Sequence, residues 1–141
     1  MASTFFSVII PVYNRPIELA ELLNCLAQQE YTNFEVIIIE DGSKIDSKEV
    51  VDTFKNKLTI SYYVKENGGQ GFARNYAFER AKSDFFVILD SDALIEPTYL
   101  TEVYKGIQEE HLDLFGGPDK EHKSFTPIQK AISFSMTSFF T

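Results

Sequence analysis

Residues 84–95 read DFFVILDSDALI, in which five consecutive apolar residues are followed at once by Asp90, Ser91 and Asp92. A short unbroken apolar run bounded by turn-forming residues is typical of a strand that is buried on both faces. Such strands occur in parallel sheets whose two faces are covered by helices. The stretch therefore predicts a core strand over 84–90 that ends on two carboxylates one residue apart.

Three similar apolar runs precede this stretch, at residues 5–12 (FFSVIIPV), 34–41 (FEVIIIED) and 58–64 (LTISYYV). The segments between the four runs carry helical signals: Leu19, Leu22, Leu23 and Leu26 lie on one helical face, and further helices are expected near 50–54, over 72–82 and from Pro97. We expect Asn14 to cap the first helix, and Asp46 or Ser47 to cap the second. Strands that alternate with helices predict an α/β domain with an open, mostly parallel sheet and helices on both faces.

The segment after the last predicted helix is less regular. LDLFGG (112–117) is a candidate fifth strand, and Thr126 and Pro127 can open another helix. The chain then ends on apolar residues, including Phe139 and Phe140, whereas terminal residues are usually polar. We therefore expect these residues to be the front portion of a longer protein.

Composition limits the classes of partner. The formal net charge of −8 and the pI near 4.7 argue against nucleic-acid binding, which depends on clustered Lys and Arg. Cys25 is the single cysteine, so neither an internal disulfide nor a cysteine-based zinc site is expected. No apolar stretch reaches the ~18 residues of a membrane span. A cytoplasmic location is the expectation, while peripheral membrane association and the oligomeric state stay open.

Polar residues gather where the predicted strands end. The first strand ends in Val12, Tyr13 and Asn14, the second in Glu40, Asp41 and Gly42, and the fourth in Asp90, Ser91 and Asp92. Because ligands bind beyond the carboxyl ends of the strands in open parallel sheets, these clusters predict a site at one edge. The ENGGQG loop (66–71) and Arg74 follow the third strand and belong to the same edge.

Four carboxylates at one edge would repel one another. Two like charges 4 Å apart cost about 4 kcal/mol at an effective dielectric constant of 20. A divalent cation that prefers oxygen ligands, Mg²⁺ or Mn²⁺, would offset this repulsion and bridge to a diphosphate. The alternative is that Asp90 and Asp92 only cap the turn before Pro97, since an Asp-X-Asp pair by itself is a weak signal.

Taken together, VIIPVYN, VIIIEDGS, ENGGQGFARN and FFVILDSDALIEP resemble the successive motifs of the family 2 glycosyltransferases, over roughly residues 5–118. The resemblance implies the GT-A fold, whose first half is a Rossmann-like nucleotide-binding unit. It also implies a nucleotide-diphosphate sugar as donor, most often UDP-linked, and transfer to an acceptor hydroxyl in glycan or polysaccharide synthesis with inversion at the anomeric carbon.

The resemblance also implies roles for individual residues. Pro11, Val12 and Tyr13 would line the nucleoside pocket, Asp41 would accept a hydrogen bond from the uracil ring N–H, and Glu40 would serve the pocket less directly. Gly68, Gly69 and Gly71 would allow a close backbone approach to the nucleotide. Arg74 would face the base or the phosphates, with a surface salt bridge as the alternative. In the Asp-X-Asp motif, Asp92 would coordinate the metal directly. Asp90 would lie against the ribose or a metal-bound water, and Ser91 between them would also contact the donor.

The same resemblance divides the chain into a donor-binding domain, 1–118, and the start of an acceptor-side region, 119–141. The family's general base comes from further downstream, and neither Asp119 nor Glu121 stands in a matching context. The catalytic base is therefore expected to lie outside this chain, which alone would not be fully active. A non-catalytic nucleotide-binding or interaction module stays open as an alternative. A phosphoacceptor signalling domain fits less well, since it needs an acidic pair where the first strand ends in PVYN.

Overall fold

The computed structural model describes residues 4–110 of the chain. The chain divides into two compact units, Met1–Thr98 and Tyr99–Thr141. The first unit contains four strands and three helices in alternation, and the described part of the second unit is the helix α4 (Tyr99–Glu110). The expected strand over 112–117, the expected helix from Thr126 and the expected domain boundary after residue 118 lie outside the described residues.

The four strands form one parallel sheet, as the sequence predicts. They are β1 (Phe6–Val12), β2 (Phe34–Asp41), β3 (Ile60–Lys65) and β4 (Phe85–Ile88), in the order β3-β2-β1-β4. Every residue of β1 is buried, which explains why its sequence is apolar without alternation except for Ser7, whose hydroxyl donates to the buried Glu35 carboxylate at 2.7 Å. The chain order reverses beside β1, because β2 and β4 flank it on opposite sides.

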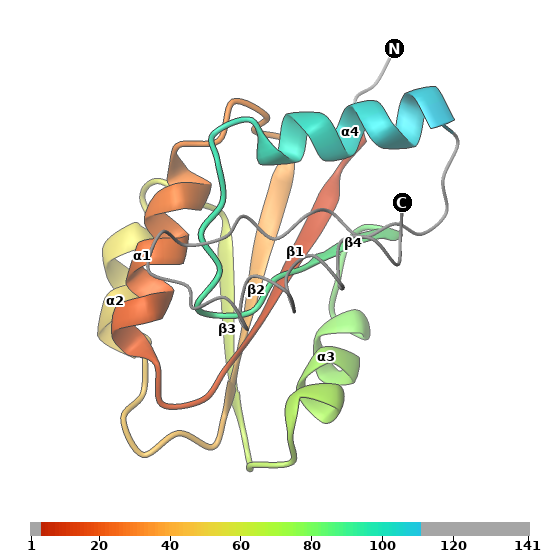
Figure 1. The fold of residues 1–141 in the computed structure, drawn as a ribbon. Coiled ribbons are helices and arrows are strands. Elements are labelled where there is room, and N and C mark those ends of the chain that lie inside the picture. The colour runs from red at the N-terminus through yellow and green to blue at the C-terminus, as the bar shows by residue number, and fades with distance from the viewer. Residues whose placement is uncertain (1–3, 111–141) are drawn as a thin grey trace, which may run out of the picture. The chain divides into compact units, whose positions relative to one another are not determined.

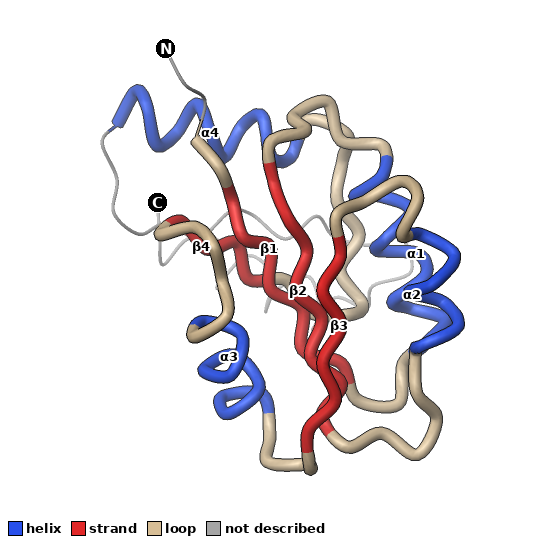
Figure 2. The backbone as a smooth tube through the Cα atoms, turned by 180° about the vertical axis from the view of Figure 1, so that it is seen from behind, coloured by secondary structure: helices blue, strands red, loops and turns tan. Residues whose placement is uncertain are grey.

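Helices cover both faces of this sheet. α1 (Pro16–Ala27) and α2 (Lys48–Phe54) lie together on one face, and α3 (Gln70–Phe78) lies on the other (Figures 1 and 2). The buried residues of α1 are the four leucines that the helical spacing indicates: Leu19, Leu22, Leu23 and Leu26. The predicted α/β architecture is therefore confirmed. Among residues 4–110, no helix has the length and apolar character needed to cross a bilayer.

Alternation along the strands divides the core into two layers. Ile9, Ile37 and Ile39 pack with Ala73 and Ala77 of α3 in one buried cluster. Because side chains alternate between the faces of a sheet, the even-numbered residues of β2 point to the face that α1 and α2 cover. This alternation decides the environment of every polar residue at the end of β2.

Several predicted boundaries need correction. Asn14 does not cap α1: it adopts φ 52° and its Oδ1 accepts hydrogen bonds from the N–H groups of Lys44 and Ile45 at 2.7 and 3.1 Å. Arg15 holds the N-cap position of α1 instead. Asn14 therefore joins the end of β1 to the loop after β2, a contact between segments that no local signal reveals.

The remaining corrections concern element ends. β4 is shorter than the predicted 84–90, and α3 begins at Gln70 rather than 72 and ends at Phe78 rather than 82. α4 begins at Tyr99, two residues after Pro97. Ser47 holds the N-cap position of α2 without a side-chain bond, while the Asp46 carboxylate accepts a hydrogen bond from Lys48 N–H at 3.2 Å.

Candidate functional site

A pocket of about 280 Å³ lies at the carboxyl ends of the strands. This is the edge of the sheet at which ligands bind in open α/β folds, beside the point where strand order reverses. Its volume is near the lower end of small-molecule sites. The lining residues come from four separate segments: Pro11, Val12, Tyr13, Arg15, Asp41, Asn67, Gly69, Gln70 and Ser91.

Pro11 explains why the sheet opens at this place. Ile9 O accepts a hydrogen bond from Leu89 N–H at 3.0 Å, and pairing between β1 and β4 ends at Ile9 and Ile88. Pro11 is two residues further along β1, so its backbone nitrogen faces the β4 side and has no hydrogen to donate. β4 consequently ends there, and the backbone that leads to Ser91 turns away to form one wall of the pocket.

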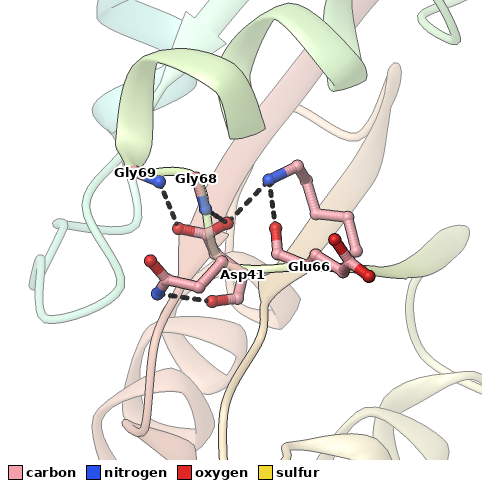
Figure 3. A network of polar contacts seen from close by, with 6 residues as sticks. Asp41, Glu66, Gly68 and Gly69 are labelled. Carbon is pink, nitrogen blue, oxygen red and sulfur yellow. Dashed lines mark hydrogen bonds and ion pairs between the residues drawn. The ribbon is translucent and has the colours of Figure 1, made fainter.

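The Asp41 carboxylate is the most strongly bonded group in the pocket wall (Figure 3). Its Oδ1 accepts hydrogen bonds from Lys65 Nζ at 2.8 Å and from Gly68 N–H at 3.0 Å, and its Oδ2 accepts one from Gly69 N–H at 2.9 Å. Asn67 Nδ2 also donates to the backbone oxygen of Asp41 at 3.0 Å. These bonds fix the glycine-rich loop against the end of β2.

This network determines the charge of Asp41. Burial by itself raises the pKa of the Asp41 carboxyl, but the hydrogen bonds from Lys65, Gly68 and Gly69 outweigh burial and lower the pKa below its ordinary value. Asp41 is therefore an ionised acceptor at neutral pH, with only 6% of its side chain exposed.

Two glycines permit the close packing around Asp41. Gly42 has φ +70°, and a Cβ at this position would lie 2.5 Å from the backbone nitrogen of Asn67. Gly69 has φ +95°, which allows its N–H to point at Asp41 as α3 begins. The glycine-rich loop therefore depends on backbone conformations that other residues adopt only with strain.

Glu40 does not line the pocket. Its Oε2 accepts hydrogen bonds from Ser47 N–H at 3.1 Å and from the Tyr62 hydroxyl at 2.9 Å, and its side chain is fully buried. Burial, with the bond to Glu40, raises the pKa of the Tyr62 hydroxyl above its ordinary value. Glu40 lies on the opposite face of the sheet from Asp41 because adjacent strand residues alternate, so it supports the loop before α2.

The two carboxylates of the Asp-X-Asp motif face arginines. Asp92 Oδ2 lies 3.5 Å from Arg15 Nη1, and Asp90 Oδ1 lies 3.6 Å from Arg74 Nη2. Both aspartates are more than half exposed, and neither lines the pocket, whereas Ser91 between them does. Arg74 Nε is buried without a hydrogen-bond partner among the described residues. The predicted repulsion among carboxylates is thus already offset by one cation beside each of Asp41, Asp90 and Asp92.

The Asp-X-Asp carboxylates suit one kind of metal site, in which the ligand supplies part of the coordination. Among residues 4–110, no three His, Cys, Asp or Glu side chains come close enough together to hold a metal ion by themselves. Asp90 and Asp92 supply only oxygen ligands and are accessible. Mg²⁺-type ions often take one or two protein carboxylates, with substrate phosphates and water as the other ligands. The pair therefore fits a metal that binds together with a diphosphate.

The sequence reasoning placed Pro11, Val12, Tyr13, Asp41, Gly69 and Ser91 at this edge, and the structure brings all six together in the pocket wall. Arg15 and Lys65 beside the pocket were not predicted, and Asn67 and Gln70 were predicted only as part of the ENGGQG loop (66–71). Lys65 could have been found by extending the third strand one residue, since Asp41 and Lys65 are partners in the parallel register. No local sequence pattern indicates that Arg15 belongs to the site, because its partner Asp92 lies 77 residues away in the sequence.

The comparison with protein families gives a match over nearly the whole chain. The model described as Glycosyl transferase family 2 matches residues 7–140. The poly(ribitol-phosphate) beta-N-acetylglucosaminyltransferase TarS of Staphylococcus aureus is 37% identical over 113 residues, which are 77% of this chain and 20% of TarS. The glycosyltransferase GlyG of Streptococcus pneumoniae is 30% identical over 118 residues, covering 82% of this chain and 39% of GlyG.

Solved structures agree with these relatives. Residues 1–349 of S. aureus TarS in complex with UDP-GlcNAc superpose with a TM-score of 0.72 at 32% identity, covering 86% of this chain and 39% of that one. The mannosyltransferase PcManGT of Pyrobaculum calidifontis, solved with GDP-Man and Mn²⁺, gives a TM-score of 0.70 over 76% of this chain and 33% of its own. At 24% identity, that likeness concerns the fold alone. The chain spans less than half the length of each of these relatives.

Proposed function

This chain belongs to glycosyl transferase family 2, and we propose on that basis that it is the donor-binding portion of a glycosyltransferase. The donor is a nucleotide-diphosphate sugar, UDP-linked, and the acceptor is a hydroxyl group of a glycan or of a lipid-linked acceptor. The transfer depends on Mg²⁺ or Mn²⁺ and inverts the anomeric carbon.

The observation that carries the proposal is the Asp41 carboxylate. It is ionised, fixed by three hydrogen bonds, and placed in the wall of a pocket that Tyr13 and Ser91 also line. A fixed acceptor of this kind suits the single ring N–H of uracil. TarS, which is 32% identical over the compared residues, has been solved with UDP and with UDP-GlcNAc, and this supports a UDP-linked donor here.

The other residues of the site would contact different parts of the donor: the base, the diphosphate and its metal. Tyr13, which is half exposed at the pocket, offers an aromatic face to the base. Arg15 and Arg74 supply positive charge near the Asp-X-Asp motif, where the diphosphate would lie. Asp92, with Asp90, would hold the divalent metal, which when bound supplies positive charge against the diphosphate as it leaves.

A second candidate is a non-catalytic nucleotide-binding module. Asp41 is the only carboxylate among the pocket-lining residues that the structure describes, and both of its oxygens already accept internal hydrogen bonds, so it is not a free base. Both candidates bind the nucleotide. They differ in the longer protein, in which only the first gives sugar transfer from a UDP-linked donor.

The first test is thermal unfolding of the chain with UDP and Mn²⁺ or Mg²⁺. A ligand at about 100 times its dissociation constant stabilises the folded state by about 2.7 kcal/mol, so we expect Tm to rise by several degrees. Asp92→Asn should remove the part of this rise that depends on the metal and leave the metal-free Tm nearly unchanged.

Asp52→Asn is the matched control, because Asp52 is a surface carboxylate that pairs with Lys48 and Lys55 away from the pocket. It should retain the full response to UDP and metal. The proposal is contradicted if UDP fails to raise Tm of the unmodified chain with either metal.

A further inference from the structure

Lys65 is the last residue of β3 and the register partner of Asp41 on β2. Its Nζ donates hydrogen bonds to Asp41 Oδ1 at 2.8 Å and to the backbone oxygen of Glu66 at 2.5 Å (Figure 3). Only 17% of its side chain is exposed, whereas lysine side chains are rarely buried unless they are paired. The ammonium group is therefore directed at the pocket carboxylate and not at solvent.

The internal hydrogen bonds of the Asp41 carboxylate leave few acceptor positions free for a ligand. An ionised carboxylate has about four acceptor positions. Lys65 Nζ and Gly68 N–H occupy two positions on Oδ1, and Gly69 N–H occupies one on Oδ2. One position remains, on Oδ2, and Asp41 lines the pocket. A ligand in the pocket thus meets a single negatively charged acceptor.

We propose that Lys65 is a positioning residue that sets the base preference of the pocket, by holding Asp41 ionised with one acceptor position for the ligand. This inference rests on the proposed function, because it assumes that a nucleotide base lies against Asp41. Gly68 and Gly69, which the sequence places at the site, also donate to Asp41, but Lys65 is the donor of the three that carries a charge.

The base preference follows from the ring nitrogens. Uracil carries an N–H at the ring nitrogen between its two carbonyl groups, whereas cytosine carries a lone pair at the same position. An ionised Asp41 accepts a hydrogen bond from the first and repels the second. A protonated Asp41 would reverse this preference, since its O–H could donate to the cytosine nitrogen.

Burial raises the pKa of the Asp41 carboxyl, and the hydrogen bond from Lys65 is the largest of the effects that lower it. The other titratable or charged side chains at the pocket are Arg15 and Tyr13, from the segment that follows β1. Without Lys65, burial remains and one main opposing cause is lost, so the pKa of Asp41 rises. Protonation then begins at a higher pH in Lys65→Met than in the unmodified chain.

The test measures dissociation constants of UDP and CDP, with Mg²⁺, for the full chain and its variants near pH 7.5 and near pH 5.5. For Lys65→Met we expect UDP to bind about tenfold more weakly near neutral pH. The dissociation constant of CDP should change less than that of UDP, so the preference for UDP over CDP should shrink. This preference should shrink further at the lower pH. Lys65→Arg, which keeps a cation, should stay within about threefold of the unmodified chain.

Lys55→Met is the matched control, because it removes the same charge from a surface ion pair with Asp52. It should leave both dissociation constants unchanged. If Lys65→Met does not fold, Lys65→Gln takes its place. In either variant, NMR titration of the Asp41 carboxyl carbon without ligand should show a midpoint at higher pH than in the unmodified chain.

The possible results separate the two proposals. Failure of the unmodified chain to bind UDP would overturn the proposed function. Binding of UDP by the unmodified chain, with a UDP to CDP preference that Lys65→Met leaves unchanged at both pH values, would overturn the role of Lys65 alone. An equal loss of both nucleotides would do the same, because it would indicate a merely structural role.

Discussion

Glu40 and Asp41 are adjacent carboxylates with opposite environments. Glu40 is fully buried and accepts hydrogen bonds from Tyr62 and Ser47, while Asp41 lines the pocket and pairs with Lys65. The difference arises because neighbouring strand residues point to opposite faces of the sheet. One position along the strand therefore separates a structural carboxylate from one in the pocket wall.

The pKa of Asp41 gives a prediction for stability against pH. A carboxyl whose pKa is lowered by folding stabilises the folded state above its unfolded pKa, which is about 3.9 for Asp, and this stability is lost as pH falls through the lower folded pKa. We expect Asp41→Asn to lose about 1–3 kcal/mol of unfolding free energy at neutral pH, because three partly buried hydrogen bonds lose their charged acceptor.

Urea unfolding at a series of pH values checks this expectation. The curve for Asp41→Asn should fall less steeply in the acid range than the curve for the unmodified chain. Identical acid slopes would mean that Asp41 does not titrate differently in the two states. Asp52→Asn, at an exposed ion pair, should retain the acid slope that Asp41 contributes.

At the scale of elements, the loops after β1, β2 and β3 form the site together. Asn14 accepts hydrogen bonds from the loop after β2, and Asn67 in the loop after β3 donates to the last residue of β2. Pro11 ends the pairing with β4 and so opens the remaining side. The rigid strands thus position loops that would have no fixed conformation alone.

Gly42 and Gly69 form a matched pair for testing the loop after β3. Gly42→Ala adds a left-handed backbone penalty and a Cβ that meets the Asn67 backbone at 2.5 Å, so it should cost about 2–4 kcal/mol. Gly69→Ala carries only the backbone penalty, about 1–3 kcal/mol at φ 95° and ψ 166°, because nothing lies within 4 Å of its Cβ. Chemical unfolding measures both, and equal costs would contradict the assigned contact.

At the scale of the molecule, stability resides in the two apolar layers of the first unit. Ile37 on the inner strand β2 is 1% exposed and packs in the cluster with Ala73 and Ala77 of α3. The loops that form the pocket connect these packed elements. Core packing therefore supports the site without contributing a polar group to it.

Ile37→Ala should lower the unfolding free energy by about 2–5 kcal/mol, because it leaves a cavity in a packed layer. Ile17→Ala removes a side chain that is 74% exposed on α1 and should cost less than about 0.5 kcal/mol. Urea denaturation of the two variants gives the comparison. Similar costs for both would show that the layer beneath α3 is not tightly packed.

The sequence by itself determined the parallel α/β architecture and the edge at which the pocket lies. Both follow from local patterns: unbroken apolar runs specify buried strands, helical spacing specifies α1, and parallel strands bring their carboxyl ends to one edge. Tyr13, Asp41 and Ser91 could be placed there for this reason.

Tertiary structure alone decided how the charges are paired. Lys65 meets Asp41 across two strands, Arg15 meets Asp92 over 77 residues, and Glu40 turns to the other face with Tyr62. Each of these contacts depends on the register between strands or the path of a distant loop, and such non-local geometry leaves no periodic trace in the sequence.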